Sequence, residues 1–276
     1  MAHKVLQFLN VLIKSVLRAQ DFKQIGKLPK YFQQNERVDI PAHNLEMWPG
    51  YLTQSRLLAD GIFLNVDTAA RFIQKSSILD WINARMKDGW DKKRIAAEFD
   101  SSNTDKSRKT VITTYNIKSY QVDGLDWNQN PQTHTFVKKK GGKEYTCSMA
   151  QHIEEDYKIK LKFPQQPLLY VNFRDRRLYF PTECCREASL PENFTSDSRK
   201  MKDLQEFKIG DPNKRMQRVC DVINKLLQAG EFKQFDIQLK NEEHKVVGYV
   251  HNPPTLVANK GTASWDQYTA RKIPHA

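Results

Sequence analysis

The chain has 276 residues and a formal net charge of +12 at pH 7, which favours an anionic partner over a neutral one. Its length is sufficient for one large or two modest domains, each with a core of its own. It contains no run of 18 apolar residues and no regular spacing of its four cysteines, which excludes a membrane-spanning helix and a disulfide framework.

The amino-terminal segment has the spacing of an amphipathic helix. Its apolar residues recur at i, i+3, i+4, i+7, i+8, i+11 and i+12, in the order Val5, Phe8, Leu9, Leu12, Ile13, Val16 and Leu17. Such an apolar face needs a partner surface, which we expect sequence beyond this chain to supply. Pro29, Pro41 and Pro49 then separate extended segments, and residues 61–66 predict a buried strand.

Two capping boxes mark helix starts in the central part of the chain. Ser77 opens a helix that runs to about residue 85, and Ser148 opens another. Residues 90–99 predict a further short helix. The strand patterns lie at residues 111–115, 120–125, 136–140, 143–147, 168–171 and 177–180. Gly141-Gly142 separates two of these strands and is typical of a two-residue hairpin turn.

The carboxy-terminal part begins with a clear helix start. Asp211 suits an N-cap and Pro212 suits the first turn, and Gly230 predicts where the helix stops. Residues 235–239 and 245–250 predict a hairpin. The whole pattern favours an α+β protein, with strands clustered centrally and helices at the edges.

Cations and aromatic side chains gather in the central part. Between residues 106 and 145 eight Lys or Arg stand against three Asp or Glu, and between residues 158 and 177 six stand against one. Around them lie six aromatic residues on predicted elements: Tyr115, Tyr120, Phe136, Tyr157, Tyr179 and Phe180. Aromatic faces stack bases and cations neutralise phosphates, so the combination favours a single-stranded nucleic acid, although each aromatic residue taken alone could equally be core.

No catalytic or metal-binding pattern competes with this interpretation. The acidic run Glu154-Glu155-Asp156 lies on a predicted helix, where consecutive side chains diverge, and a solvated acidic face explains it better. The seven histidines lack the His-x-x-x-His spacing of a metal site, and neither a phosphate-binding glycine loop nor a nucleophile elbow occurs. We therefore expect no catalysis, no metal and no cofactor.

The run from Tyr115 to Pro131 resembles the start of the PAZ domain in Piwi-clade Argonaute proteins, most specifically in Asp126-Trp127-Asn128-Gln129-Asn130-Pro131. The likeness extends over the whole chain, for example to Trp48-Pro49-Gly50-Tyr51. It implies the end of the amino-terminal region and the first linker at residues 1–76, a PAZ domain at 77–192 and the second linker at 193–276. It also implies an OB-like β-barrel with an inserted β-hairpin and helix, flanked by mixed α/β linkers.

The same resemblance implies a cleft that anchors the 3′ end of a small guide RNA, with a preference for a 2′-O-methylated end. The residues at the matching positions are Lys118, Tyr120, Phe136, His152, Tyr157 and Phe180. Weaker candidates for contacts with the RNA backbone are Tyr115, Lys138, Lys139 and Lys140. Two positions depart from the family pattern: His152 stands where a tyrosine is usual, and Asp156 would repel phosphate if it faced the cleft.

The expected partners follow from the resemblance. They are a guide RNA and either the remaining Argonaute domains or another protein of the ribonucleoprotein, inside the cell in cytoplasm or nucleus and without a membrane. The slicing residues of the family belong to its Piwi domain, which we expect this chain to lack, so an enzyme is not expected. The alternative is a protein-docking platform whose PAZ pocket is degenerate.

Overall fold

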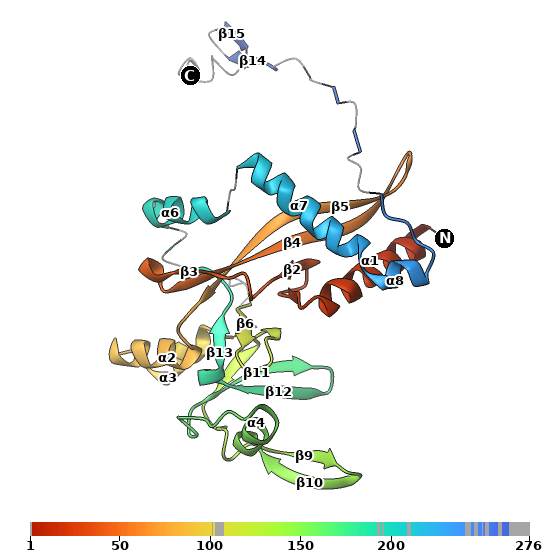
Figure 1. The fold of residues 1–276 in the computed structure, drawn as a ribbon. Coiled ribbons are helices and arrows are strands. Elements are labelled where there is room, and N and C mark those ends of the chain that lie inside the picture. The colour runs from red at the N-terminus through yellow and green to blue at the C-terminus, as the bar shows by residue number, and fades with distance from the viewer. Residues whose placement is uncertain are drawn as a thin grey trace. The chain divides into compact units, whose positions relative to one another are not determined.

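The computed structural model describes residues 2–100, 102, 108–191, 194, 196–208, 211–240, 244–245, 248–249, 251, 254–258 and 261–264 (Figure 1). The chain divides into two compact units, Met1–Leu239 and Lys240–Ala276. In the second unit β14 (Thr255–Ala258) pairs with β15 (Gly261–Ser264). None of the described helices has the length and apolar content needed to span a membrane.

A five-stranded antiparallel sheet lies in the amino-terminal part of the first unit. Its longest strands, β4 (Leu45–Leu58) and β5 (Gly61–Gln74), pair along their whole length. The sheet is completed by β1 (Lys23–Gln24), β2 (Lys30–Phe32) and β3 (Val38–Ile40), and the 3₁₀ helix η1 (Pro41–His43) follows β3. Residues 61–66 are a strand as predicted, but they are exposed or half-buried, so the prediction of a buried strand was wrong. Gly50 allows β2 to lie close to β4, because a Cβ there would stand 2.2 Å from the Tyr31 carbonyl oxygen.

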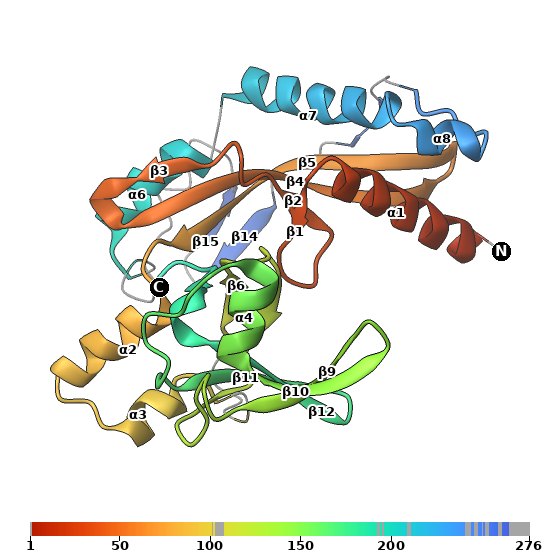
Figure 2. The same ribbon diagram turned by 60° about the horizontal axis from the view of Figure 1, so that its bottom comes forward.

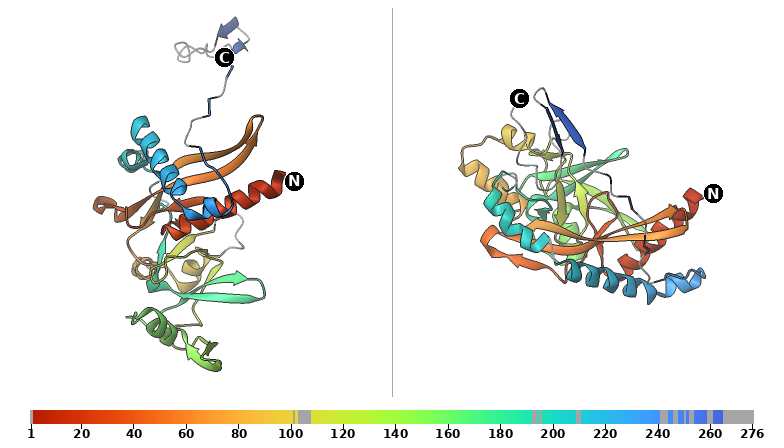
Figure 3. Two further views of the ribbon diagram at one scale, coloured as in Figure 1. Left: turned by 45° about the vertical axis from the view of Figure 1, so that its right-hand side comes forward. Right: turned by 90° about the horizontal axis from the view of Figure 1, so that it is seen from above.

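Helix α1 (Ala2–Ala19) buries its apolar face against elements far along the chain. Figure 3 shows α1 and α7 (Pro212–Leu227) beside the long β4–β5 hairpin. Leu17 of α1 is fully buried, in one cluster with Leu226 of α7 and with Phe232 of α8 (Gly230–Gln234). The expectation of a partner beyond this chain was wrong for the part of the face formed by Leu12, Ile13, Val16 and Leu17, whereas Val5 and Phe8 of the same face are exposed. Helix α7 begins as predicted, since the Asp211 carboxylate accepts a hydrogen bond from the Asn213 N–H.

Two three-stranded antiparallel sheets make up the centre of the chain. One has the order β13 (Cys185–Glu187), β6 (Thr110–Thr113), β7 (Ser119–Gln121), and the other β12 (Arg176–Pro181), β11 (Leu168–Phe173), β8 (Gly124–Asp126). One cluster of buried side chains contains residues of both sheets and of α2 (Ile78–Lys87). The α+β class and the OB-like character of this region are confirmed, although the described strands form two sheets and not one closed barrel.

The remaining elements surround these sheets. Both halves of the predicted capping box at Ser77 are present at the start of α2, and α3 (Lys92–Ala97) is the predicted second short helix. The 3₁₀ helix η2 (Thr182–Cys184) joins β12 to β13, and α6 (Ser198–Lys208) follows. Residues 235–239 are not a strand, because this segment turns after α8, so the predicted hairpin was wrong there. Its other half, residues 245–250, lies largely outside the described residues.

A hairpin and a helix are inserted between β8 and β11, as predicted. Strands β9 (Thr135–Lys140) and β10 (Lys143–Ser148) pair around Gly141-Gly142, and both glycines have positive φ. Helix α4 (Met149–Tyr157) follows, and its Ser148 capping box is complete. Figure 2 shows this insertion beside β11 and β12. The insertion therefore faces the β12–β11–β8 sheet.

A buried polar network joins the small sheets to the five-stranded sheet. Arg186 of β13 donates from Nε to the Gln74 carbonyl oxygen at 2.7 Å, and its Nη2 lies 3.0 Å from Oε1 of Glu46 on β4. The other Glu46 oxygen accepts a hydrogen bond from Trp48 Nε1 at 3.0 Å. Gln74 also donates to Glu187, at 3.2 Å. These contacts fix β13 against the long hairpin.

Candidate nucleic-acid interface

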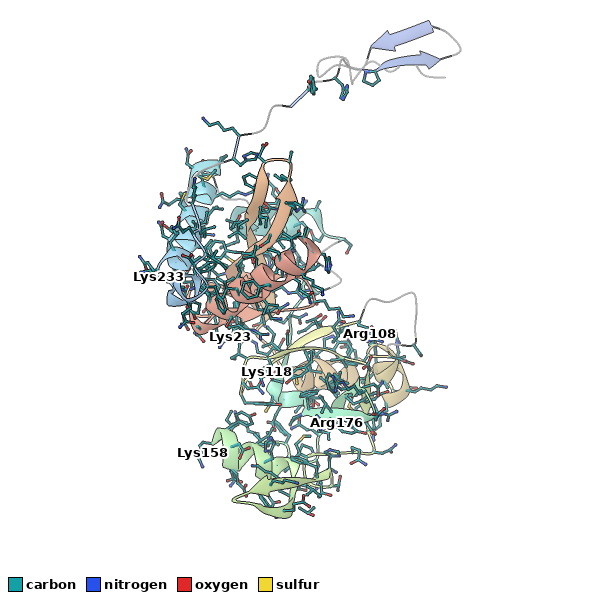
Figure 4. The ribbon with its side chains drawn as sticks, turned by 90° about the vertical axis from the view of Figure 1, so that its right-hand side faces the viewer. Lys23, Arg108, Lys118, Lys158, Arg176 and Lys233 are labelled. Carbon is teal, nitrogen blue, oxygen red and sulfur yellow. The ribbon has the colours of Figure 1, made fainter. Side chains whose placement is uncertain are left out.

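A cavity of about 420 Å³ is lined by the β6–β7 turn, the inserted hairpin, α4 and β12. All six residues predicted to hold an RNA 3′ end line it: Lys118, Tyr120, Phe136, His152, Tyr157 and Phe180. Tyr115, predicted as a weaker backbone contact, lines it as well. Figure 4 labels Lys118 on the turn, Arg176 on β12 and Lys158 just after α4. The fold thus brings together residues that are separated by more than 60 positions in the sequence.

Aromatic rings form a continuous wall on the side of the insertion. The His152 ring stands edge-on to Phe136 at a centroid distance of 5.2 Å and edge-on to Tyr157 at 5.8 Å. Tyr157 in turn packs against Tyr115 at 4.6 Å. Because α4 carries His152 and Tyr157 while β9 carries Phe136, the capping box and the hairpin register together set the geometry of this wall. It offers flat apolar faces of the kind on which a base or ribose can pack.

The opposite wall comes from the small sheets. Tyr120 of β7 packs against the buried Phe180 of β12 at a centroid distance of 4.3 Å. Burial raises the pKa of Tyr115 far above its ordinary value and also raises the pKa of Tyr120. Both phenols therefore keep their protons at neutral pH and remain hydrogen-bond donors, which suits an anionic ligand.

The side chains that line the cavity include cations but no carboxylate. Lys118, Arg176 and Arg177 supply the positive charge, and only Lys118 was a predicted site residue. Arg177 is held in place, since its guanidinium carbon lies 4.6 Å from the centroid of the Tyr170 ring and its Nε donates to Asn172 Oδ1 at 3.2 Å. The two arginines belong to the basic run at residues 174–177, so their charge was a signal, but their direction depends on how β12 pairs with β11.

Asn116 and His134 are two further lining residues that the sequence reasoning missed. Asn116 is a turn residue, and its Oδ1 accepts the Lys118 N–H at 3.2 Å. The His134 ring lies 4.4 Å from that of Tyr179, and burial lowers the pKa of His134, so this imidazole stays neutral at pH 7. No local sequence signal distinguishes either residue from an ordinary loop residue.

Lys138 and Lys139 of the hairpin, which were predicted to contact the RNA backbone, pair with carboxylates and do not line the cavity. Lys138 forms a hydrogen-bonded ion pair with Asp156, and Lys139 Nζ lies 2.8 Å from Glu144 Oε1. Neither side chain lines the cavity, and the Lys140 side chain lies outside the described part of the chain. Asp156 also does not line the cavity, and its carboxylate lies 3.1 Å from His152 Nδ1, where the atoms are not aligned for a hydrogen bond. Lys138 therefore offsets the charge that would otherwise repel phosphate.

Within the described ranges, no three His, Cys, Asp or Glu side chains lie together as a metal site. Comparison with known proteins gives a family match for part of the chain. The PAZ domain family model matches residues 85–208. The chain is 26% identical to Piwi-like protein 1 of Gallus gallus over 234 residues, which are 79% of this chain and 25% of that protein. It is 24% identical to Piwi-like protein Siwi of Bombyx mori over 267 residues, 91% of this chain and 28% of that protein.

A solved structure shows the same fold. The crystal structure of Drosophila Piwi matches with a TM-score of 0.61 and 20% identity, covering 95% of this chain and 32% of that chain. The chain thus spans about a quarter to a third of the length of these relatives. The fold, the cavity and the family match together indicate a PAZ domain in residues 85–208. Over most of its length the chain is similar to Piwi-like proteins.

Proposed function

We propose that this chain binds the 3′-terminal nucleotides of a single-stranded small guide RNA, and that it acts by binding and not by catalysis. The observation that carries the proposal is the single cavity lined by all six residues at the RNA-contacting positions of the family. Its aromatic walls suit stacking with the terminal nucleotide, and Lys118, Arg176 and Arg177 suit the phosphates.

The partners and boundaries belong to the same proposal. The relatives are named as Piwi-like proteins, so we infer that the chain works together with further Argonaute domains or a protein of the same ribonucleoprotein. A PAZ domain at residues 77–192 is supported by the isolated bridge between Ser77 and Arg186. An intracellular location agrees with the four cysteines, all of which are free thiols.

The chemistry of the RNA 3′ end tests the proposal. Three otherwise identical single strands with a 5′ fluorophore would carry a 3′ hydroxyl, a 2′-O-methyl with 3′ hydroxyl, or a 3′ phosphate. We expect the 3′ phosphate to weaken binding by about tenfold or more, because its extra charge would be desolvated against Phe136 and Phe180. The methyl group adds apolar surface to the contact, so the methylated strand should bind at least as well as the unmodified one. Fluorescence anisotropy measures all three affinities.

Equal affinities for the three strands would contradict end-specific recognition and indicate internal binding. Absence of binding to any of them would favour the alternative, a protein-docking platform.

A further inference from the structure

A second cavity, of about 590 Å³, lies on the other side of the β6–β7 turn. Three of its lining residues, Asn116, Lys118 and Tyr120, also line the first cavity. The rest of its lining comes from Ile117 and Ser119 near the turn and from the end of α1, β1 and the residues beside β1, and it includes Arg18 and Lys23. Figure 4 labels Lys23 and Lys118 close to each other in this region. The two cavities therefore share one wall.

The second cavity is basic. Arg18, Lys23 and Lys118 line it, and no carboxylate of the described residues does. Lys23 Nζ lies 2.7 Å from Asp21 Oδ1, so this carboxylate partly neutralises Lys23. Within the described part of the chain, Arg18 and Lys118 form no salt bridge. Both of these side chains are exposed to solvent. The cavity is thus bordered by Arg18 and Lys118, which have no salt bridge in the described part of the chain, and by Lys23, which Asp21 partly neutralises.

The shared wall is fixed to the linker by packing and hydrogen bonds. Ile117 has a φ of 53°, which is unfavourable for a β-branched residue, and its side chain packs into the linker core cluster that contains Trp48. Ser119 Oγ donates to the Gln24 carbonyl oxygen at 3.2 Å and accepts the Gly26 N–H at 3.3 Å. Because the turn is held on both sides of Lys118, that side chain stays at the border between the cavities.

We propose that the second cavity binds the phosphodiester backbone of the nucleotides that precede the 3′-terminal ones. The RNA strand would pass over Lys118 from one cavity into the other, and Arg18 and Lys23 would neutralise the upstream phosphates. The proposal rests on the proposed function of the first cavity. RNA is favoured over a protein segment because the cavity is continuous with the aromatic pocket and its charged lining is cationic only.

Strand length separates the two cavities experimentally. The full chain and its Arg18→Gln/Lys23→Gln variant would be titrated with a uridine dinucleotide and a uridine octanucleotide, each with a 5′ fluorophore and a 3′ hydroxyl. We expect the variant to bind the octanucleotide about tenfold more weakly and the dinucleotide within about twofold of wild type. The salt slope for the octanucleotide should fall by about 0.7 for each lost phosphate contact.

The matched control is Lys4→Gln/Lys14→Gln, which removes two charges from the same helix at positions that line neither cavity. It should bind both strands like wild type, and thermal unfolding verifies that both variants fold. An equal loss for dinucleotide and octanucleotide in the Arg18 variant would overturn the proposal, because the cations would then act on the terminal site. An unchanged octanucleotide affinity would also overturn it. If Phe136→Ala still weakened both strands in that case, the proposed function would stand; if it did not, both would fail.

Discussion

Replacing Phe136 with alanine is expected to weaken binding of a single-stranded RNA 3′ end by about 1–3 kcal/mol, the contribution of one stacked base. This corresponds to a loss of about fivefold to a hundredfold in affinity. The reason is geometric: Phe136 lines the cavity and stands edge-on to His152, so its removal takes away the end of the aromatic wall that the hairpin contributes. Anisotropy titration with the 3′-hydroxyl strand measures the loss.

Two further variants make this result specific. Phe136 also packs partly into the cluster of Met149 and Ile153, so Phe136→Leu is needed to keep apolar volume while removing the aromatic face. The affinity of Phe136→Leu for the RNA should therefore fall nearly as much as that of Phe136→Ala. Phe163→Ala is the matched control, because this side chain is 55% exposed and lines neither cavity. Similar losses for Phe136→Ala and Phe163→Ala would argue against a stacking role.

Local signals account for much of what the sequence predicted. The Ser148 capping box sets where α4 starts, and the Gly141-Gly142 turn sets the register of the hairpin, with Lys143 opposite Lys140. Together they determine which way Phe136, His152 and Tyr157 point. The resemblance to the PAZ signature predicted the opposite side of the cavity, because it implied that this insertion faces the β6–β7 turn and β12.

Long-range pairing accounts for what the sequence did not predict. Residues 120–125 have the pattern of one strand, yet the structure has β7 and β8 in different sheets. Asp123 lies between them, buried, and its carboxylate accepts the Asn172 N–H at 2.7 Å and faces Arg108 at 3.1 Å. Asn172, the hydrogen-bond partner of this carboxylate, lies 49 positions away in the sequence. The local residue pattern therefore does not indicate that Asp123 separates two strands.

Long-range contacts also determine which of the cations are available to bind RNA. Lys138 and Lys139 were predicted to contact RNA because cations cluster on the hairpin, but Asp156 and Glu144 pair with them. Arg176 and Arg177 carry the same kind of charge and do line the cavity. Composition gives the number of cations, and only the fold determines which of them meet a carboxylate of the same chain.

Replacing Arg186 with methionine is expected to destabilise the first unit by about 3–5 kcal/mol, the usual cost of leaving a buried charge without its partner. Glu46 is 8% exposed, and without Arg186 the contact that remains to its carboxylate among the described residues is the hydrogen bond from Trp48. The variant also leaves the Gln74 carbonyl oxygen without the Arg186 donor. Urea unfolding, followed by tryptophan fluorescence, measures the change in the free energy of unfolding.

The double variant Glu46→Gln/Arg186→Met separates charge from packing. Glutamine can still accept the Trp48 N–H but carries no charge, so the double variant should regain about half or more of the stability lost in the single one. A double variant less stable than Arg186→Met would show that Arg186 acts through the Gln74 hydrogen bond instead. Because Arg186 joins β13 to the five-stranded sheet, and β13 pairs with β6 next to the turn that separates the cavities, its loss should also loosen that wall. In Arg186→Met the affinity for the octanucleotide should therefore fall more than the affinity for the dinucleotide.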